Sequence, residues 1–295
     1  MSNDQQKISQ ASLNVTLGRR VLEPAYPLIP HFNVPPTPAD LQIDAHLAAF
    51  CSSSVPLEST RELQRREVVL SKLRTIFESW VVGVCQEKGH AKEFAEAAGG
   101  KIYTSGSYRL AVHEPGADID CICVAPNVCT REDFFGSLAP LISSNPQVTR
   151  FQSVSEAFVP IMTFYFDGVN IDLLFARVNT NCVRKEFDID SDEVMVGIDT
   201  ATEKSLNGPR TTNLIAKLVT DPTNPTRYKN FLIVVRLVRK WAKAKGLYSN
   251  KMGYLGGVNI NILVALVVQM LPLASPSSLF RKFFAIYKYW RRSTQ

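Results

Sequence analysis

Hydrophobic residues recur with two different spacings, one helical and one alternating, and these spacings predict the secondary structure of the first two thirds of the chain. Apolar residues from Val69 to Val84 recur at helical spacing, which predicts a helix from Glu62 to about Gln86, with a cap at Ser59 or Thr60. Shorter helices are predicted at 91–98 and 131–142. Beyond Gly100 the period becomes two, which is typical of strands. The predicted strands are Lys101–Thr104, Ile119–Val124, Phe151–Ala157, Pro160–Phe166 and Val169–Phe175.

The flanking regions have different patterns. Residues 1–58 carry six prolines between Pro24 and Pro38, so an extended or partly disordered arm is expected, with one short helix near 40–50. Residues 178–205 are predicted to form an acidic surface loop. From 206 onward four helices are expected. They lie at 212–219, at 226–245, from the Gly256-Gly257-Val258 turn to Met270, and from Ser275 to about Trp290. The predicted fold class is α+β: a mixed sheet with helices in 59–205, then a helical domain in 206–295.

Composition and charge narrow the class of protein. The chain has 295 residues, 45% hydrophobic and 20% charged, an ordinary globular balance. The longest apolar run, Ile262–Val268, is too short to span a bilayer, and no signal peptide is evident, so no membrane association is expected. The six cysteines are scattered and are interpreted as reduced thiols rather than a zinc site. Residues 210–295 carry a net +14 with one acid, Asp221, whereas 1–209 carry −8. This asymmetry predicts a lobe that binds a polyanion beside an acidic lobe.

The candidate chemistry lies in Gly106–Asp120, which reads GSYRLAVHEPGADID. Asp118 and Asp120 are two residues apart at the start of a predicted strand, so both side chains face one side, and a cation such as Mg²⁺ is expected between them. The alternative is a turn residue and a solvated strand face. Gly106 and Ser107 at the start of a helix would let a phosphate approach backbone N–H groups.

A third carboxylate is expected from the strand at 169–175. Asp172 lies in a largely apolar segment, where a lone aspartate is costly unless it is paired or metal-bound. A hydrogen-bonded core aspartate is the alternative. Asp167 is the rival candidate, but Asp167-Gly168 is a strong hairpin signal, and we interpret Asp167 as a turn former.

These motifs resemble a known family. Gly-Ser, a short spacer, Asp-x-Asp and a later strand aspartate are similar to the nucleotidyltransferase superfamily that includes DNA polymerase beta. The longer string GGKIYTSGSYRLAVHEPGADID, with TREDFF and EAFVPI after it, resembles eukaryotic nuclear poly(A) polymerases. The resemblance extends from about Glu62 to Trp290.

The resemblance implies template-independent addition of AMP from ATP to RNA 3′ ends. Asp118, Asp120 and Asp172 would hold two Mg²⁺ or Mn²⁺ ions, and Asp172 would help to accept the proton of the RNA hydroxyl. Gly106 and Ser107 would hold the β- and γ-phosphates. A nuclear location, an RNA 3′ end as acceptor and partners among mRNA 3′-end processing factors are further implications.

The family's central domain contributes further nucleotide contacts. The positions that correspond here are Asn207, Arg239, Tyr248, Asn250, Gly256, Gly257 and Val258. At 239 the family has a lysine, and this chain has an arginine, which is a planar fork rather than a point charge. An aromatic residue before Gly-Ser is replaced by Ser105. A tryptophan soon after Gly-Gly-Val is replaced by the Asn259–Asn261 segment.

The resemblance also implies a chain that stops early. The end at Gln295 leaves the central domain incomplete and the C-terminal RNA-binding domain absent. Two alternatives to adenylyl transfer therefore stay open. One is a nucleotidyltransferase with another nucleotide, such as UTP, or another RNA acceptor. The other is a catalytically weak regulatory paralogue.

Overall fold

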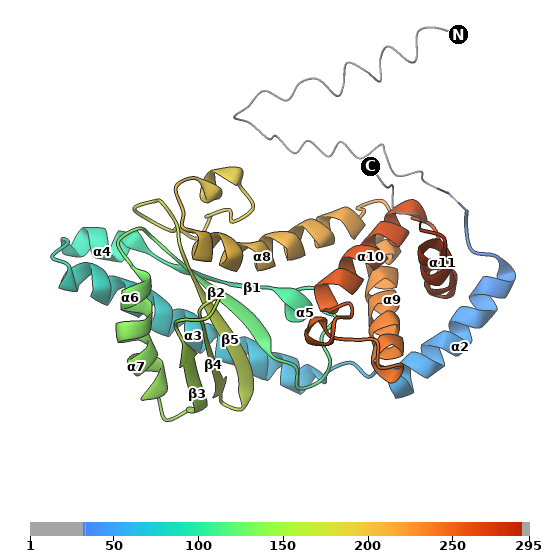
Figure 1. Cartoon of the computed structure of the whole chain (residues 1–295), viewed down its shortest axis with the longest axis horizontal. Coiled ribbons are helices and arrows are strands. Elements are labelled where there is room, and N and C mark those ends of the chain that lie inside the picture. Colours follow the sequence, from blue (N-terminus) through green and yellow to red (C-terminus); the bar gives the residue numbers. More distant parts are fainter. Residues whose placement is uncertain (1–31, 33, 291–295) are drawn as a thin grey trace, which may run out of the picture. The chain divides into compact units, whose positions relative to one another are not determined.

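The centre of the fold is a five-stranded mixed sheet (Figure 1). A computed structural model describes residue 32 and residues 34–290. The strand order is β1-β2-β5-β4-β3, in which β2 and β5 are parallel and the other pairs are antiparallel. The strands are β1 (Lys101–Thr104), β2 (Ile119–Ala125), β3 (Val148–Val154), β4 (Ile161–Phe166) and β5 (Val169–Arg177).

Helices account for most of the remaining described chain. Those before and within the sheet region are α2 (Pro38–Ser54), α3 (Thr60–Glu87), α4 (Lys92–Ala98), α5 (Gly106–Arg109), α6 (Arg131–Asp133), a π-helical turn (Phe134–Leu138) and α7 (Ala139–Ser143). Those after it are a 3-10 turn (Asp192–Met195), α8 (Thr200–Val219), α9 (Pro225–Ala244), a second 3-10 turn (Asn250–Met252), α10 (Gly257–Met270) and α11 (Pro276–Lys288). None of the helices in the described part is both long and apolar enough to cross a membrane.

The two faces of the sheet are covered by different helices (Figure 1). On one face Cys121 and Cys123 of β2 pack into a core with Phe77 and Trp80 of α3. On the other face Ile122 and Val124 pack into a second core that includes Leu206 of α8. Because strand side chains alternate, Asp120 shares the face of Ile122 and Val124, which is the α8 face.

A third core lies among the helices α8 to α11. It contains buried residues such as Phe231, Val264 and Phe283, and it also takes in Leu110 and Val112 from the segment between α5 and β2. The segment that joins the two candidate motifs is therefore anchored in the helical core rather than on the sheet.

The sheet follows the sequence prediction closely. All five strands form, and the turn at Asp167-Gly168 joins β4 and β5 as an antiparallel hairpin. Both turn residues have positive φ, 48° at Asp167 and 76° at Gly168. Asp167 therefore lies in the turn between Phe166 and Val169, and its side chain forms a 2.7 Å ion pair with Lys72.

Two helices differ from prediction. The helix expected to begin near Thr212 begins at Thr200, because Asp199 caps it through the backbone N–H of Thr202, and Pro209 is accommodated within it. The short helix expected near 40–50 forms but is longer, Pro38–Ser54, because Thr37 and Asp40 form a capping box at the start of α2. α2 packs on α11, where Asp40 pairs with Arg281. Residues 1–31 of the predicted arm lie outside the described residues, and the domain limits at 59 and 206 stay predictions.

Phe77→Ala should strongly destabilise the protein. The Phe77 side chain is 1% exposed in the core between α3 and the sheet, and such a truncation costs roughly 3–5 kcal/mol. Urea denaturation measures the change in free energy of unfolding. Val68→Ala, at a position 53% exposed on the same helix, is the control and should stay within about 0.5 kcal/mol of wild type. Equal effects of the two changes would contradict the placement of α3.

Candidate active site

Asp120 and Asp172 lie beside each other on neighbouring parallel strands. The register of β2 and β5 pairs their Cα positions directly, and neighbouring strands are about 4.8 Å apart. The register is set by the apolar residues that follow on both strands, which are buried on the two faces of the sheet. The sequence predicted both positions, and the structure brings them together on the face that α8 covers.

Burial and like charge raise the pKa of both carboxyls. For Asp120, burial and the charges of Asp118 and Asp172 raise the pKa to about 7. For Asp172, burial and the charge of Asp118 raise the pKa to about 6. The three carboxylates therefore repel one another, and no hydrogen bond or ion pair to their side chains is present among residues 34–290. A cation would relieve this repulsion.

The three carboxylates are coupled by charge, but they are not arranged as a finished coordination sphere. Within the described part of the chain no three His, Cys, Asp or Glu side chains are grouped closely enough to hold a metal ion. Their chemistry nevertheless suits a hard divalent cation, because all the donors are carboxylate oxygens.

Gly106 sits directly against Asp120. Its φ is +60°, and a Cβ at this position would collide with Oδ2 of Asp120, so both conformation and space require glycine. The Gly106 N–H donates to the Thr212 hydroxyl of α8 at 3.1 Å, and the Ser105 N–H donates to the Asp120 carbonyl at 2.9 Å. The Gly-Ser turn and the Asp-x-Asp strand are therefore one structural unit.

Side chains of α9 bind the backbone carbonyls of the segment that joins these two motifs. Hydrogen bonds run from Tyr228 to the Leu110 carbonyl (3.2 Å), from Arg236 to that of Ala111 (2.6 Å) and from Arg239 to that of Val112 (3.3 Å). Lys243 adds an ion pair to Glu114 at 2.8 Å. Ala111 has a φ of +56°, a conformation that an L-residue adopts only when its surroundings require it.

The predicted central-domain residues fall into two places. Arg239, Tyr248 and Gly257 lie together, because a Cβ on Gly257 would meet Nη2 of Arg239 at 3.0 Å and the Tyr248 hydroxyl at 3.2 Å. Asn250 lies 3.8 Å from the Cβ position of Gly256. Val258 is 52% exposed at the start of α10. Asn207 is exposed on α8, one residue before Gly208, which lies against Ser105.

Arg239 is buried and already engaged by the protein. It is 8% exposed, and beyond the Val112 carbonyl its Nη2 donates to the Gly257 carbonyl (3.4 Å) and to Oδ1 of Asn261 (3.0 Å). Burial lowers its pKa, which the neighbouring Tyr248 and Glu114 partly offset. Its role as a phosphate contact stays a prediction. The sequence analysis missed Asn261 as a partner, although a buried asparagine in the apolar helix α10 was the available signal.

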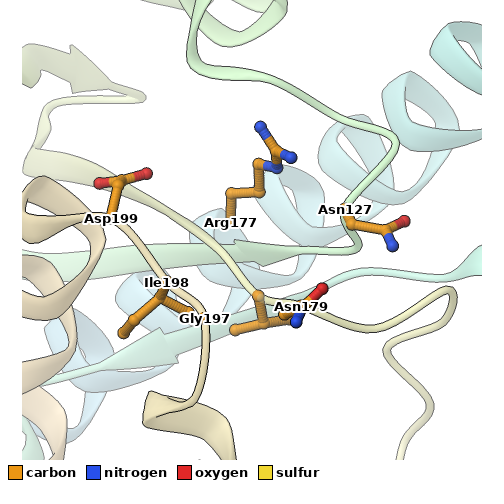
Figure 2. A pocket seen from close by; sticks show the side chains of 7 residues that line it. Asn127, Arg177, Asn179, Gly197, Ile198 and Asp199 are labelled. Carbon is orange, nitrogen blue, oxygen red and sulfur yellow. The ribbon is translucent and has the colours of Figure 1, made fainter.

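A separate pocket of about 130 Å³ lies at the carboxyl ends of β2 and β5 (Figure 2). Asp120 and Asp172 stand nearer the opposite ends of these strands. The pocket is lined by Asn127, Arg177, Val178, Asn179, Gly197, Ile198 and Asp199. Asp199 caps α8 and pairs with Arg131 at 3.1 Å, so part of the lining already has a structural role.

A mixed sheet with a Gly-Ser turn against an Asp-x-Asp strand and a third aspartate in register defines a nucleotidyltransferase fold. Comparison with known families gives the narrower assignment. The family described as the poly(A) polymerase nucleotidyltransferase domain matches residues 31–219, and the one described as the poly(A) polymerase central domain matches residues 230–295. The chain belongs to the poly(A) polymerase family.

Relatives and solved structures agree with this assignment. Over 87% of this chain, the sequence is 40% identical to nuclear poly(A) polymerase 4 of Arabidopsis thaliana. Over 89% of this chain, it is 37% identical to a poly(A) polymerase of Dictyostelium discoideum. It spans about a third of the length of these relatives, 34% and 32% respectively.

Among solved structures, the Cid1 poly(U) polymerase with Mg and 3′-dATP bound aligns over 85% of this chain and 74% of its own. The TM-score is 0.57 and the identity 12%. The polymerase core of TRAMP, an RNA surveillance complex, aligns over 82% of this chain and 63% of its own, with a TM-score of 0.50 and 21% identity. At these identities the likeness concerns the fold.

Asp120→Asn should stabilise the metal-free protein at neutral pH. The folded state raises the pKa of Asp120 from 3.8 to about 7, so the folded carboxyl binds its proton more tightly than the unfolded one. Wild-type stability should therefore fall relative to the variant as pH rises from about 4 to 7. Each pKa unit corresponds to about 1.4 kcal/mol, which makes the gain above pH 7 at most about 4 kcal/mol.

Urea denaturation in a chelator between about pH 4 and 8 measures this difference. Glu186→Gln is the matched control, because Glu186 is exposed and has no hydrogen bond or ion pair among the described residues. No pH-dependent gain in Asp120→Asn beyond that of the control would contradict the coupled carboxylates.

Proposed function

We propose that this chain carries the catalytic part of an enzyme that adds AMP from ATP to RNA 3′ ends without a template. The observation that supports this most is the cluster of three coupled carboxylates beside the Gly106 turn. The names of the relatives at 37–42% identity support ATP as the nucleotide and RNA as the acceptor.

In this proposal Asp118, Asp120 and Asp172 hold two divalent cations, Mg²⁺ or Mn²⁺. When bound, such ions neutralise the triphosphate and make the RNA 3′-hydroxyl more acidic. The 3′-oxygen attacks the α-phosphorus of ATP, the bond to pyrophosphate breaks, and the hydroxyl proton leaves toward Asp172.

The remaining predicted residues bind and orient ATP. Gly106 and Ser107 hold the β- and γ-phosphates beside the aspartates, since Gly106 lies directly against Asp120. The nucleotide contacts of the helical region are Asn207, Arg239, Tyr248, Asn250, Gly256, Gly257 and Val258. Arg239 acts there from a fixed position, since it is tied to Asn261 and to two backbone carbonyls.

The whole protein's setting is part of the same proposal. The relatives named as nuclear enzymes support a nuclear location and, with it, partners among mRNA 3′-end processing factors. Fifteen basic residues and one acid in 210–295 support a polyanionic acceptor, since RNA binding draws on such a charge excess.

Asp172→Asn should lower RNA primer extension at least about 1,000-fold, because essential catalytic groups act as a unit. The assay uses a short labelled RNA ending in oligo(A), each NTP separately, and Mg²⁺ or Mn²⁺. Asp167→Asn is the control, because Asp167 lies five residues earlier in the hairpin turn and pairs with Lys72, and this variant should stay close to wild type.

The same assay separates the alternatives. Extension with ATP alone supports adenylyl transfer, and extension with UTP or another nucleotide would move the chain to a sister activity. Metal-dependent ATP binding without any extension would favour a regulatory paralogue. Full activity in Asp172→Asn would contradict the assignment of the third carboxylate.

A further inference from the structure

Glu58 lies outside every predicted motif, in the link between α2 and α3. Its side chain is only 4% exposed. One carboxylate oxygen, Oε2, accepts from Nε of Arg66 at 2.7 Å and lies 3.0 Å from Nε2 of His113. The other, Oε1, accepts from the backbone N–H of Gly116 at 3.4 Å. Burial alone would raise the pKa of Glu58, but these bonds and the Arg66 charge lower it, so the carboxylate stays ionised.

The partners of Glu58 belong to the segment that leads to the catalytic strand. His113 and Gly116 precede Asp118, with only Ala117 between Gly116 and Asp118. α9 hydrogen-bonds the same segment at the carbonyls of 110–112 and pairs with the side chain of Glu114. Within the described residues, Glu58 is the side chain that accepts from the Gly116 N–H, while the Ala117 N–H donates to the Glu114 carbonyl at 3.1 Å.

The start of α3 also contacts the Gly-Ser turn. Tyr108 follows Gly106 and Ser107, and its ring lies 5.2 Å from that of His113 and 5.7 Å from the Arg66 guanidinium. Its hydroxyl donates to Glu67 at 2.6 Å. One cluster thus touches both the phosphate-binding turn and the approach to Asp118.

Stability alone does not account for this cluster. The Arg66, Glu58 and His113 side chains are 4–8% exposed. Nη1 of Arg66 and Nδ1 of His113 are buried without a hydrogen-bond partner among the described residues. A buried ion pair with unsatisfied neighbours is weak evidence for stability, since an apolar pair of similar volume is often as stable or more stable.

We infer that Glu58 is a positioning residue, which sets the place of Asp118 and Asp120 through Gly116 and His113. The inference rests on the proposed nucleotidyl transfer. Groups that orient metal ligands from behind typically contribute 10–100-fold to metal affinity or activity. Glu58 holds the backbone on which the ligands stand, and we expect an effect in the same range.

The test removes the ion pair as a whole. In the double variant Glu58→Met/Arg66→Met no buried charge is left unpaired, so the free energy of unfolding should stay near or above that of wild type. His113 and Gly116 nevertheless lose their acceptor. The control is Lys92→Met/Glu96→Met, which removes one acid and one base from an exposed pair on α4.

Two readouts are expected to change in the Glu58→Met/Arg66→Met protein. In metal-free protein, amide hydrogen exchange of residues 110–118 should be at least about 10-fold faster than in wild type. In primer extension, kcat should fall about 10–100-fold, with a similar rise in the Mg²⁺ concentration for half-maximal rate and an unchanged KM for RNA. The α4 control should match wild type in both.

The outcomes separate this inference from the proposed function. Exchange does not depend on activity. If exchange is faster in the double variant but the wild-type protein extends no primer, the positioning of the segment is upheld and the proposed function is overturned. Wild-type exchange and wild-type kcat in a folded double variant would overturn the role of Glu58. A large loss of stability with unchanged kcat would make Glu58 structural only, which would also overturn it.

Discussion

The structure depends most on how the segment from Leu110 to Ala117 is held. Its two ends carry the Gly-Ser turn and the aspartate strand, yet its apolar residues Leu110 and Val112 are buried in the helical core. α9 binds the carbonyls of residues 110–112, and Glu58 binds the N–H group of Gly116. Because a short segment fixed at both flanks has few conformations left, any shift between the sheet and α9 would move the carboxylates. This constraint joins the two parts of the chain into one site.

The second constraint is the accumulation of negative charge on the sheet. Apolar residues that follow Asp120 and Asp172 force the register of β2 and β5, and that register places the two carboxylates side by side. Burial and mutual repulsion raise the pKa of both. Folding therefore creates an unfavourable electrostatic state that a divalent cation would relieve. In this sense the hydrophobic pattern of the strands produces the affinity for metal that the proposed chemistry needs.

Much of the fold was predictable because the sheet signals are local. Period-two runs predicted all five strands, and Asp167-Gly168 predicted the hairpin between β4 and β5. The start of α8 was predicted too late, near Thr212, whereas the Asp199 cap begins the helix at Thr200. The contacts of Glu58 with His113 and Gly116 were also not predictable. They join residues 55 and 58 positions apart, and only tertiary packing brings them together.

The central claim is that Asp118, Asp120 and Asp172 form one site for divalent cations. Isothermal titration of Mn²⁺ into the protein, with and without a non-hydrolysable ATP analogue, tests it most directly. The account predicts saturable binding that strengthens with the analogue, is lost in Asp120→Asn and Asp172→Asn, and is kept in Asp167→Asn. Equal binding in all four proteins, or none in wild type with the analogue present, would contradict it.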